Sequence, residues 1–279
     1  MEILETAAAL QARAETWRRE GRRIGFVPTM GALHEGHLQL VHAAAQQNDV
    51  VIVSVFVNPT QFNNTEDFKM YPRVLGSDTE LLRSSGCTAL FAPTPEQMYP
   101  QPAVLKFDFG PLERVMEGAH RPGHFNGVAT VVSKLFHLSR PHRAYFGQKD
   151  WQQVAIVRQM VQDLSFDLEL VAAPTVRETD GLAMSSRNRR LSAEARALAP
   201  RLYEALQLAK QRLVAGPAVA QTEATAFLHQ FPEIELEYLE VADARTLQPT
   251  IEPGHDVVIC LAAWLGGVRL IDNVVVPAS

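Results

Sequence analysis

Apolar runs and segments of helical periodicity alternate along the first two-thirds of the chain. Strands are predicted by the runs at 22–29, 49–59, 88–93, 143–147 and 168–174, and the run DVVIVSVFVNP (49–59) is almost continuously apolar. Apolar positions three and four residues apart predict helices at 37–47, 78–86, 125–141 and 151–164. This alternation indicates βα units and a parallel sheet, which binds ligands at the carboxyl ends of its strands.

The last third of the chain has a different order of elements. Helices are predicted at 191–213 and 218–231, and they are followed by three strands at 234–243, 256–265 and 268–276. Two helices followed by three strands are typical of an α+β domain with an antiparallel sheet. The sequence therefore predicts an α/β protein with a parallel-sheet domain over 1–175 and a smaller α+β domain over 176–279.

Three features of the sequence indicate the cellular compartment and the class of binding partner. They are the N-terminal segment, the cysteines and the net charge. The segment 1–21 predicts an amphipathic helix and lacks the pattern of a signal peptide, and no apolar run approaches the roughly 18 residues that span a bilayer. The two cysteines, Cys87 and Cys260, make neither a disulfide framework nor a metal knuckle, so the reducing cytoplasm is expected. The net charge of -5 disfavours a nucleic-acid partner.

The stretch PTMGALHEGH (28–37) lies between a predicted strand and a predicted helix. His34 and His37 are three residues apart, so they share a face of the first helical turn. That turn exposes N–H groups and the positive end of the helix dipole, which attract phosphate, and Gly31 and Gly36 permit close approach. A zinc site of the HExxH type would need a spacing of four, and a plain strand-to-helix turn is the simplest alternative.

Two more stretches follow predicted strands in the same way. VNPTQFN (57–63) presents Asn58 and Gln61, which suit a carboxylate or a hydroxyl, although Asn-Pro is also a common start of a turn. AYFGQKDWQQV (144–154) places Lys149 at the start of a helix, where it can meet a phosphate. A capped helix with a surface lysine is the alternative explanation there.

Two polar loops complete the candidates. DGLAMSSRNRRL (180–191) lies at the predicted domain junction, and its two serines and Arg187 suggest a mobile loop that closes over a polyphosphate, or else a basic linker. GAHRPGHFNGV (118–128) contains Arg121 and two histidines, which on their own are more often surface residues than ligands.

Together these stretches resemble one known family. The HxGH-type loop followed by an MSSR loop resembles the nucleotidyl-transferase superfamily that includes class I aminoacyl-tRNA synthetases. Within it, the chain is similar to the pantoate–β-alanine ligase (pantothenate synthetase) family. The matching stretches are FVPTMGALHEGH, VNPTQF, EDFKMYPR, RPGHFNGVATVV, FGQKDWQQ, PTVRETDGLAMSSRN and YLEVAD, which run from residue 26 to 243.

The resemblance implies a reaction in two steps. ATP adenylates the carboxylate of (R)-pantoate and releases pyrophosphate, and the amine of β-alanine then attacks the pantoyl-adenylate to give pantothenate and AMP. It also implies a Rossmann-like N-terminal domain with a smaller C-terminal lid, magnesium with ATP, no tightly bound organic cofactor, and a homodimer.

The resemblance also assigns roles to residues. Those expected at ATP are Met30, Gly31, Ala32, Leu33, His34, Glu35, Gly36, His37, Gly147, Gln148, Lys149, Asp150, Val176, Met184, Ser185, Ser186 and Arg187. Of these, His34, His37, Lys149, Ser185, Ser186 and Arg187 are the expected catalytic residues. Pantoate is assigned to Gln61, Gln153, Thr29, Asn58 and Arg121, β-alanine to Gln61, and a magnesium contact to Asp78.

Two departures from the pattern stand out. Gln148 occupies a position where many relatives have Glu, and the MSSR loop lacks the lysines of the synthetases' KMSKS loop, so Lys149 and Arg187 would supply the charge. Two other functions stay open at this point. They are a nucleotidyl transferase with other substrates, and a nucleotide sensor without catalysis.

Overall fold

The computed structural model describes residues 1–63 and 65–278, which divide into two compact units. The first unit comprises Met1–Asp108, Arg121–Gln148 and Ile156–Pro174. The second comprises Phe109–His120, Lys149–Ala155 and the chain from Thr175 onward. The segments Phe109–His120 and Lys149–Ala155 thus belong with the C-terminal part, whereas the predicted division at residue 176 places them in the first domain. Within the described residues, no helix has the length and apolar character needed to cross a membrane.

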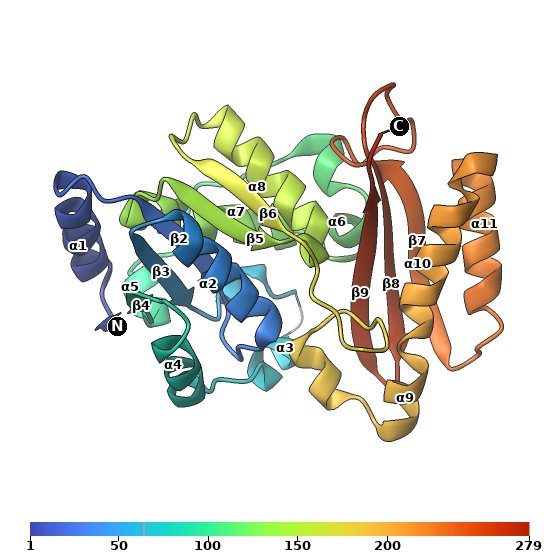
Figure 1. The fold of residues 1–279 in the computed structure, drawn as a ribbon, viewed down its shortest axis with the longest axis horizontal. Helices are drawn as coiled ribbons and strands as arrows, with labels where there is room; N and C mark the ends of the chain where they lie inside the picture. Colours follow the sequence, from blue (N-terminus) through green and yellow to red (C-terminus); the bar gives the residue numbers. More distant parts are fainter. Residues whose placement is uncertain (64, 279) are drawn as a thin grey trace. The chain divides into compact units, whose positions relative to one another are not determined.

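The first unit is built on a parallel sheet of six strands (Figure 1). The strands are β1 (Glu2–Leu4), β2 (Ile24–Thr29), β3 (Val50–Val55), β4 (Ala89–Phe91), β5 (Arg143–Gly147) and β6 (Glu169–Ala173), in the order β1-β4-β3-β2-β5-β6. From β2 the chain winds through β3 to β4 on one side, and β5 and β6 lie on the other. The junction of β2 and β5 is therefore a topological switch point, where such sheets bind ligands.

Helices cover both faces of this sheet because its strands are apolar on both faces. Phe26 of β2 packs edge-on against Phe136 of α7, with ring centroids 6.3 Å apart. Its neighbour Val27 points the other way and joins a cluster with Leu40 and Val41 of α2. The helical segments of this unit are α1 (Ala7–Arg19), α2 (Glu35–Gln47), η1 (Pro59–Gln61), α3 (Thr65–Met70), α4 (Leu75–Arg83), α5 (Pro95–Met98) and α7 (His124–Ser139). Two further segments, η3 (Gln148–Asp150) and α8 (Trp151–Asp163), have residues in both units.

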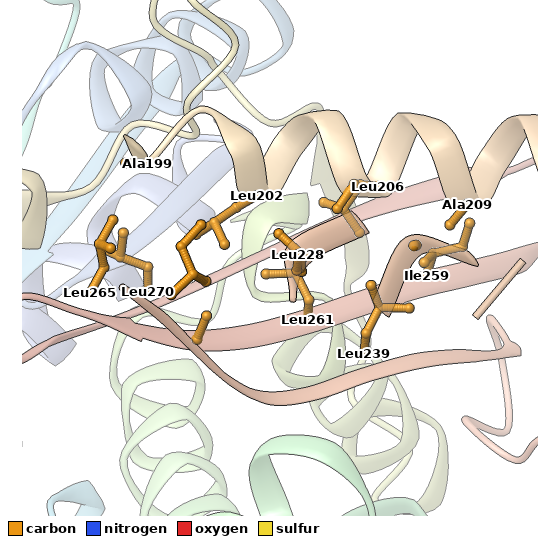
Figure 2. Close-up of a cluster of buried hydrophobic side chains, with 14 of the residues drawn as sticks. Ala199, Leu202, Leu206, Ala209, Leu228, Leu239, Ile259, Leu261, Leu265 and Leu270 are labelled. Carbon is orange, nitrogen blue, oxygen red and sulfur yellow. The ribbon is translucent and has the colours of Figure 1, made fainter. Parts of the chain in front are cut away.

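The second unit has an antiparallel sheet of β7 (Ile234–Asp243), β8 (Val257–Leu265) and β9 (Val268–Val276), in the order β7-β8-β9. Leu202, Leu206 and Ala209 form a stripe along α10, which faces Ile259 and Leu261 of the sheet (Figure 2). Each fully buried leucine contributes about 1.5–3 kcal/mol. The other helical segments are η2 (Gly110–Glu113), α6 (Met116–His120), η4 (Ser186–Arg190), α9 (Ala193–Leu198), α10 (Arg201–Arg212), η5 (Leu213–Ala215) and α11 (Pro217–Leu228).

Two elements differ from the prediction. Residues 2–4 form β1, paired in parallel with β4, whereas the sequence pattern included them in a helix. The helix predicted over 191–213 is interrupted at Pro200, with α9 ending at Leu198 and α10 starting at Arg201. Proline has no N–H to continue the α-helical pattern but fits at the start of a new helix.

Candidate active site

Three of the predicted site segments leave the same edge of the parallel sheet. β2 and β3 pair up to Thr29 and Val55, and β2 and β5 pair at Gly25–Arg143 and Phe26–Ala144. The same offset brings Thr29 level with Gly147 at the end of β5. The loops after β2, β3 and β5 therefore begin side by side at the switch point, the usual ligand site of such a sheet.

The histidine pair lies at the N-terminus of α2. His34 is the N-cap, and its Nδ1 accepts the N–H of Gly36 at 3.2 Å. The Nδ1 of His37 accepts the N–H of His34 at 3.3 Å, and the two ring centroids are 4.1 Å apart. Because both Nδ1 atoms accept, each neutral ring carries its proton on Nε2, where it is a hydrogen-bond donor. Glu35, also assigned to ATP, is exposed and accepts from Gln39.

A buried carboxylate holds the loop in front of the histidines. Asp78, which is 1% exposed, accepts the backbone N–H of Ala32 at 2.9 Å and that of Leu33 at 2.8 Å. Gly31 has a φ of +81°, and a Cβ there would lie 2.9 Å from the Asp78 carboxylate. Glycine is therefore needed at 31 for its backbone conformation and for the approach of Asp78, besides any role at phosphate.

A network of amides lies in the loop after β3. The Nδ2 of Asn58 donates to Gln61 Oε1 at 3.0 Å and to the carbonyl of Gly127 at 3.1 Å, and its Oδ1 accepts from Tyr99 Oη at 2.9 Å. Gln61 Nε2 in turn contacts Met30 Sδ at 3.1 Å. Asn58 is 1% exposed, so its direct effect is to orient Gln61.

Thr29 plays a similar supporting part at the end of β2. Its hydroxyl donates to the carbonyl of Ser54 at 2.7 Å and accepts the N–H of Gly31 at 3.1 Å. The side chain is 9% exposed. Thr29 therefore joins the ends of β2 and β3 to the start of the histidine loop.

Arg121 and His124 meet at the backbone of Gln61. The carbonyl of Gln61 lies 2.8 Å from His124 Nδ1 and 3.4 Å from Arg121 Nη2. His124 is buried, whereas its sequence context suggested a surface histidine. The three-residue spacing of Arg121 and His124 near the start of α7 could have indicated that they act together, but the sequence did not show that their shared partner is Gln61.

Two cavities in the first unit border these groups. One of about 230 Å³ is lined by Met30, Gly31 and Asp78. The other, of about 450 Å³, is lined by Thr60 and Tyr99 beside the amide network. The histidine pair lines neither cavity.

Lys149 stands where β5 passes into α8. Gly147 ends the strand, and Gln148, Lys149 and Asp150 form the single turn η3. Lys149 Nζ lies 3.9 Å from Asp150 Oδ1. Gln153 follows in the first turn of α8 and is half-buried.

The segment predicted to close over a polyphosphate begins with a hairpin and ends in the turn η4. The N–H of Met184 donates to the carbonyl of Val176 at 3.0 Å, which brings the predicted adenine contact beside the MSSR stretch. Ser185 then caps η4, in which Ser186 and Arg187 lie, by accepting the N–H of Arg187 at 3.2 Å.

The predicted site residues fall into two groups. The residues up to Gln148 belong to the first unit, and the residues from Lys149 onward belong to the second. Within the first unit Gln61 contacts Met30, and within the second unit Met184 pairs with Val176.

Comparisons with known proteins agree on one family. A family model described as Pantoate-beta-alanine ligase matches residues 2–275. The sequence is 50% identical to the pantothenate synthetase of Moorella thermoacetica, with 100% of both chains covered. It is 49% identical to that of Cytophaga hutchinsonii, with 93% of both covered.

Solved structures give the same result. The pantothenate synthetase of Thermus thermophilus matches with a TM-score of 0.90 at 46% identity, over 98% of this chain and 99% of that one. A pantoate-beta-alanine ligase from Francisella tularensis, complexed with beta-gamma ATP and beta-alanine, matches with a TM-score of 0.82 at 35% identity, over 98% and 97%. The family and the α/β fold predicted from the sequence are confirmed.

Proposed function

The chain belongs to the pantoate–β-alanine ligase family and is an ATP-dependent ligase that condenses pantoate with β-alanine, and we propose that the residues at the ends of β2, β3 and β5 and along η4 carry out this reaction. The observation that carries this proposal is the histidine pair at the N-terminus of α2, directly after β2 at the switch point of the sheet. That position favours bound phosphate.

The reaction makes the carboxylate of pantoate reactive toward an amine. A carboxylate resists attack by an amine because oxide does not leave. In the first step an oxygen of the pantoate carboxylate bonds to the α-phosphorus of ATP while the bond to pyrophosphate breaks. In the second step the β-alanine nitrogen attacks the acyl carbon, AMP leaves, and the nitrogen loses a proton. The protein needs no covalent nucleophile, so its work is positioning and charge stabilisation.

His34 and His37 are placed to stabilise charge on the phosphates. Since the Nδ1 of each ring accepts a backbone N–H, the neutral rings offer Nε2–H donors. A donor stabilises an oxyanion but does not take a proton, which favours charge stabilisation over proton transfer by His37. Lys149, Ser185, Ser186 and Arg187 add a cation, two hydroxyls and a guanidinium to the same task.

Pantoate recognition centres on Gln61 and Gln153. Gln61 is held by Asn58 on its side chain and by Arg121 and His124 at its carbonyl, so its amide is pre-oriented. We assign Thr29, Asn58 and Arg121 an indirect part, in which they fix the loops around pantoate. Gln61 is also the residue assigned to β-alanine.

Magnesium is proposed to accompany ATP, bound mainly through phosphate oxygens. Mg²⁺ commonly keeps several waters and takes one or two carboxylates besides the substrate's phosphates. The Asp78 carboxylate as described does not fit a direct ligand, because each oxygen already accepts a backbone N–H and the side chain is 1% exposed. A metal contact would require it to leave one of these N–H groups, so no step is assigned to it.

A homodimer in the cytoplasm completes the proposal. Val104 and Leu105 are adjacent in a segment without helix or strand and are 91% and 70% exposed, which makes them candidates for a surface that a second copy covers. Both cysteines are free and buried, which suits a reducing compartment.

One assay separates this function from the alternatives. The enzyme should release pyrophosphate from ATP only when pantoate is present, and AMP only after β-alanine is added. Another nucleotidyl transferase would respond to other substrates, and a nucleotide sensor would release neither product. Pyrophosphate release that does not depend on pantoate contradicts the proposal.

A further inference from the structure

Two adjacent residues of β9 contact η3, which carries the lysine assigned to phosphate, and Arg177 in the hairpin before the MSSR stretch. Asp272 and Asn273 are 5% and 4% exposed, and they lie in the middle of the strand, opposite Leu261 and Cys260 of β8. Successive side chains of a strand point to opposite faces, so the two residues reach different partners.

Asn273 reaches the lysine assigned to phosphate. Its Nδ2 donates to the backbone carbonyl of Lys149 at 2.7 Å. Lys149 lies in η3, a single short 3₁₀ turn, and hydrogen bonds in such turns have poorer geometry than those of an α-helix. This peptide unit is the point from which the lysine side chain extends, so a shift of the peptide unit shifts the region that the ammonium group can occupy. The bond fixes that peptide unit to the sheet.

Asp272 reaches the base of the hairpin before the MSSR stretch. Its carboxylate accepts from both terminal nitrogens of Arg177, at 2.6 and 3.0 Å. Arg177 also donates to the carbonyls of Gly181 and Asn273, and its guanidinium lies 3.8 Å from the ring centroid of Tyr203. Such a bidentate, stacked arginine has one orientation, so the hairpin has one position.

Contacts across the hairpin connect Arg177 to the arm that leads into the MSSR stretch. Arg177 bridges to Ala183 across it, and the N–H of Glu178 donates to the carbonyl of Leu182 at 2.8 Å. The second arm continues without interruption into Met184–Arg187. Arg177 therefore anchors the hairpin arm from which Ser185, Ser186 and Arg187 follow.

We propose that Asp272 and Asn273 are positioning residues of the ligase reaction, which hold Lys149 and the Met184–Arg187 segment in one fixed relation so that both serve the phosphates of the same ATP. The proposal rests on the assignment of these two segments to ATP. Neither residue touches the substrate. Each acts through the backbone or the side chain of another residue.

The test of Asn273 uses a double-mutant cycle with Lys149. Asn273→Ala should slow single-turnover pyrophosphate release roughly 10- to 100-fold, because small misplacements of a catalytic group are costly. The pantoate Kd should stay within about twofold. In the Lys149→Ala background the same substitution should have almost no further effect, because residues that act as a unit are not additive.

Gln248→Ala is the matched control, since Gln248 Nε2 donates to the carbonyl of Pro111 elsewhere in the same unit. It should leave the rate of pyrophosphate release unchanged. If the alanine variant of Asn273 unfolds, Asn273→Asp, which keeps the shape but lacks the donor, takes its place. A wild-type rate in a folded Asn273 variant, or an undiminished effect in the Lys149→Ala background, overturns the role of Asn273.

The outcomes separate this inference from the proposed function. A normal rate in Lys149→Ala alone would contradict the assignment of Lys149 to ATP, whereas a slow Lys149→Ala with a normal Asn273→Ala would contradict only the positioning role.

Asp272 is tested through Arg177→Lys, which keeps the charge but loses the bidentate fork. It should slow pyrophosphate release about tenfold. A folded Arg177→Lys variant with the wild-type rate removes Asp272 from the proposal.

Discussion

The carboxylate of Asp78 at the start of α4 accepts the backbone N–H of Leu33 at 2.8 Å. A second bond from Ala32 makes the contact a clamp on the loop that leads to the histidine pair. Helix α4 therefore holds the loop that follows β2.

Breaking the clamp should affect both stability and catalysis. Asp78→Asn replaces one carboxylate oxygen with an NH₂ group that faces one of the two backbone N–H donors. We expect a loss of about 1.5–3 kcal/mol in the free energy of unfolding. Adenylate formation should slow as the loop loosens. Denaturant unfolding and pyrophosphate release measure the two effects. Glu80→Gln, an exposed position on the same helix, is the control. Unchanged values for Asp78→Asn would show that the clamp is unimportant.

Removing a charge-stabilising group should slow the first chemical step. His37→Ala and Lys149→Ala should each reduce the single-turnover rate of adenylate formation about 100- to 1,000-fold, the usual effect of losing one oxyanion donor. Pantoate binding, measured by calorimetry, should change far less. His42→Ala, exposed on the same helix as His37, is the control. Near-normal adenylation in His37→Ala would refute its assignment.

The close approach of α7 to the Gln61 turn should not tolerate a side chain at residue 127. A Cβ on Gly127 would lie 2.3 Å from the carbonyl oxygen of Thr60, so Gly127→Ala forces the turn away from the helix. We expect a destabilisation of about 1–3 kcal/mol and a higher KM for pantoate.

The matched control for Gly127 is another helical glycine in open space. Gly76 in α4 has no atom within 4 Å of a built Cβ, so Gly76→Ala should be neutral or stabilise by up to about 1 kcal/mol. Equal effects of the two substitutions on pantoate KM would show that crowding at residue 127 is not the cause.

Acid should weaken the second unit through Asp243. Burial alone raises the pKa of this carboxyl, but the N–H groups of Thr246, Arg245 and Glu252 and the ring of His255 lower it to about 2. Because the pKa is depressed in the folded state, the stabilisation is complete above the unfolded pKa of about 4 and is lost as the pH falls toward 2.

The contribution of Asp243 should amount to roughly 2 kcal/mol, read from denaturant unfolding across this pH range. Asp243→Asn should be less stable at neutral pH and lose less stability on acidification. If the variant and the wild type show the same slope between pH 4 and pH 2, another carboxyl is responsible.

Charge on the exposed apolar pair should prevent self-association. Val104→Asp combined with Leu105→Asp would place two carboxylates in the proposed dimer contact, where burying them is costly. Light scattering should give a dimer for the wild type and a monomer for this variant. Val214→Asp, at a residue 96% exposed in the second unit, should remain a dimer. A monomeric wild type would refute the homodimer, and a dimeric double variant would refute its location.

Local patterns were enough for most of the parallel sheet and for the histidine loop. Strand runs such as 49–59 and the helix after His37 follow from hydrophobic period, and the spacing of His34 and His37 predicts that they share a helical turn. These features depend on residues only a few positions apart, so the local sequence is enough to predict them.

Other features could not be predicted because their partners are distant in the chain. β1 is only three residues long and exists through its pairing with β4. Asp78 looked like an ordinary helix start or a metal contact, and His124 looked like a surface residue, until the fold brought them to Leu33 and Gln61.

The hydrophobic pattern and the motifs by themselves thus determined the class of fold and the family, and they predicted the groups that meet ATP. Only the tertiary structure decided which buried side chains hold those groups. A hydrogen bond such as that from Asn273 to Lys149 joins positions 124 residues apart, and no local preference of either residue encodes it. Its strength depends on burial and alignment, which exist only once the strands and helices have packed.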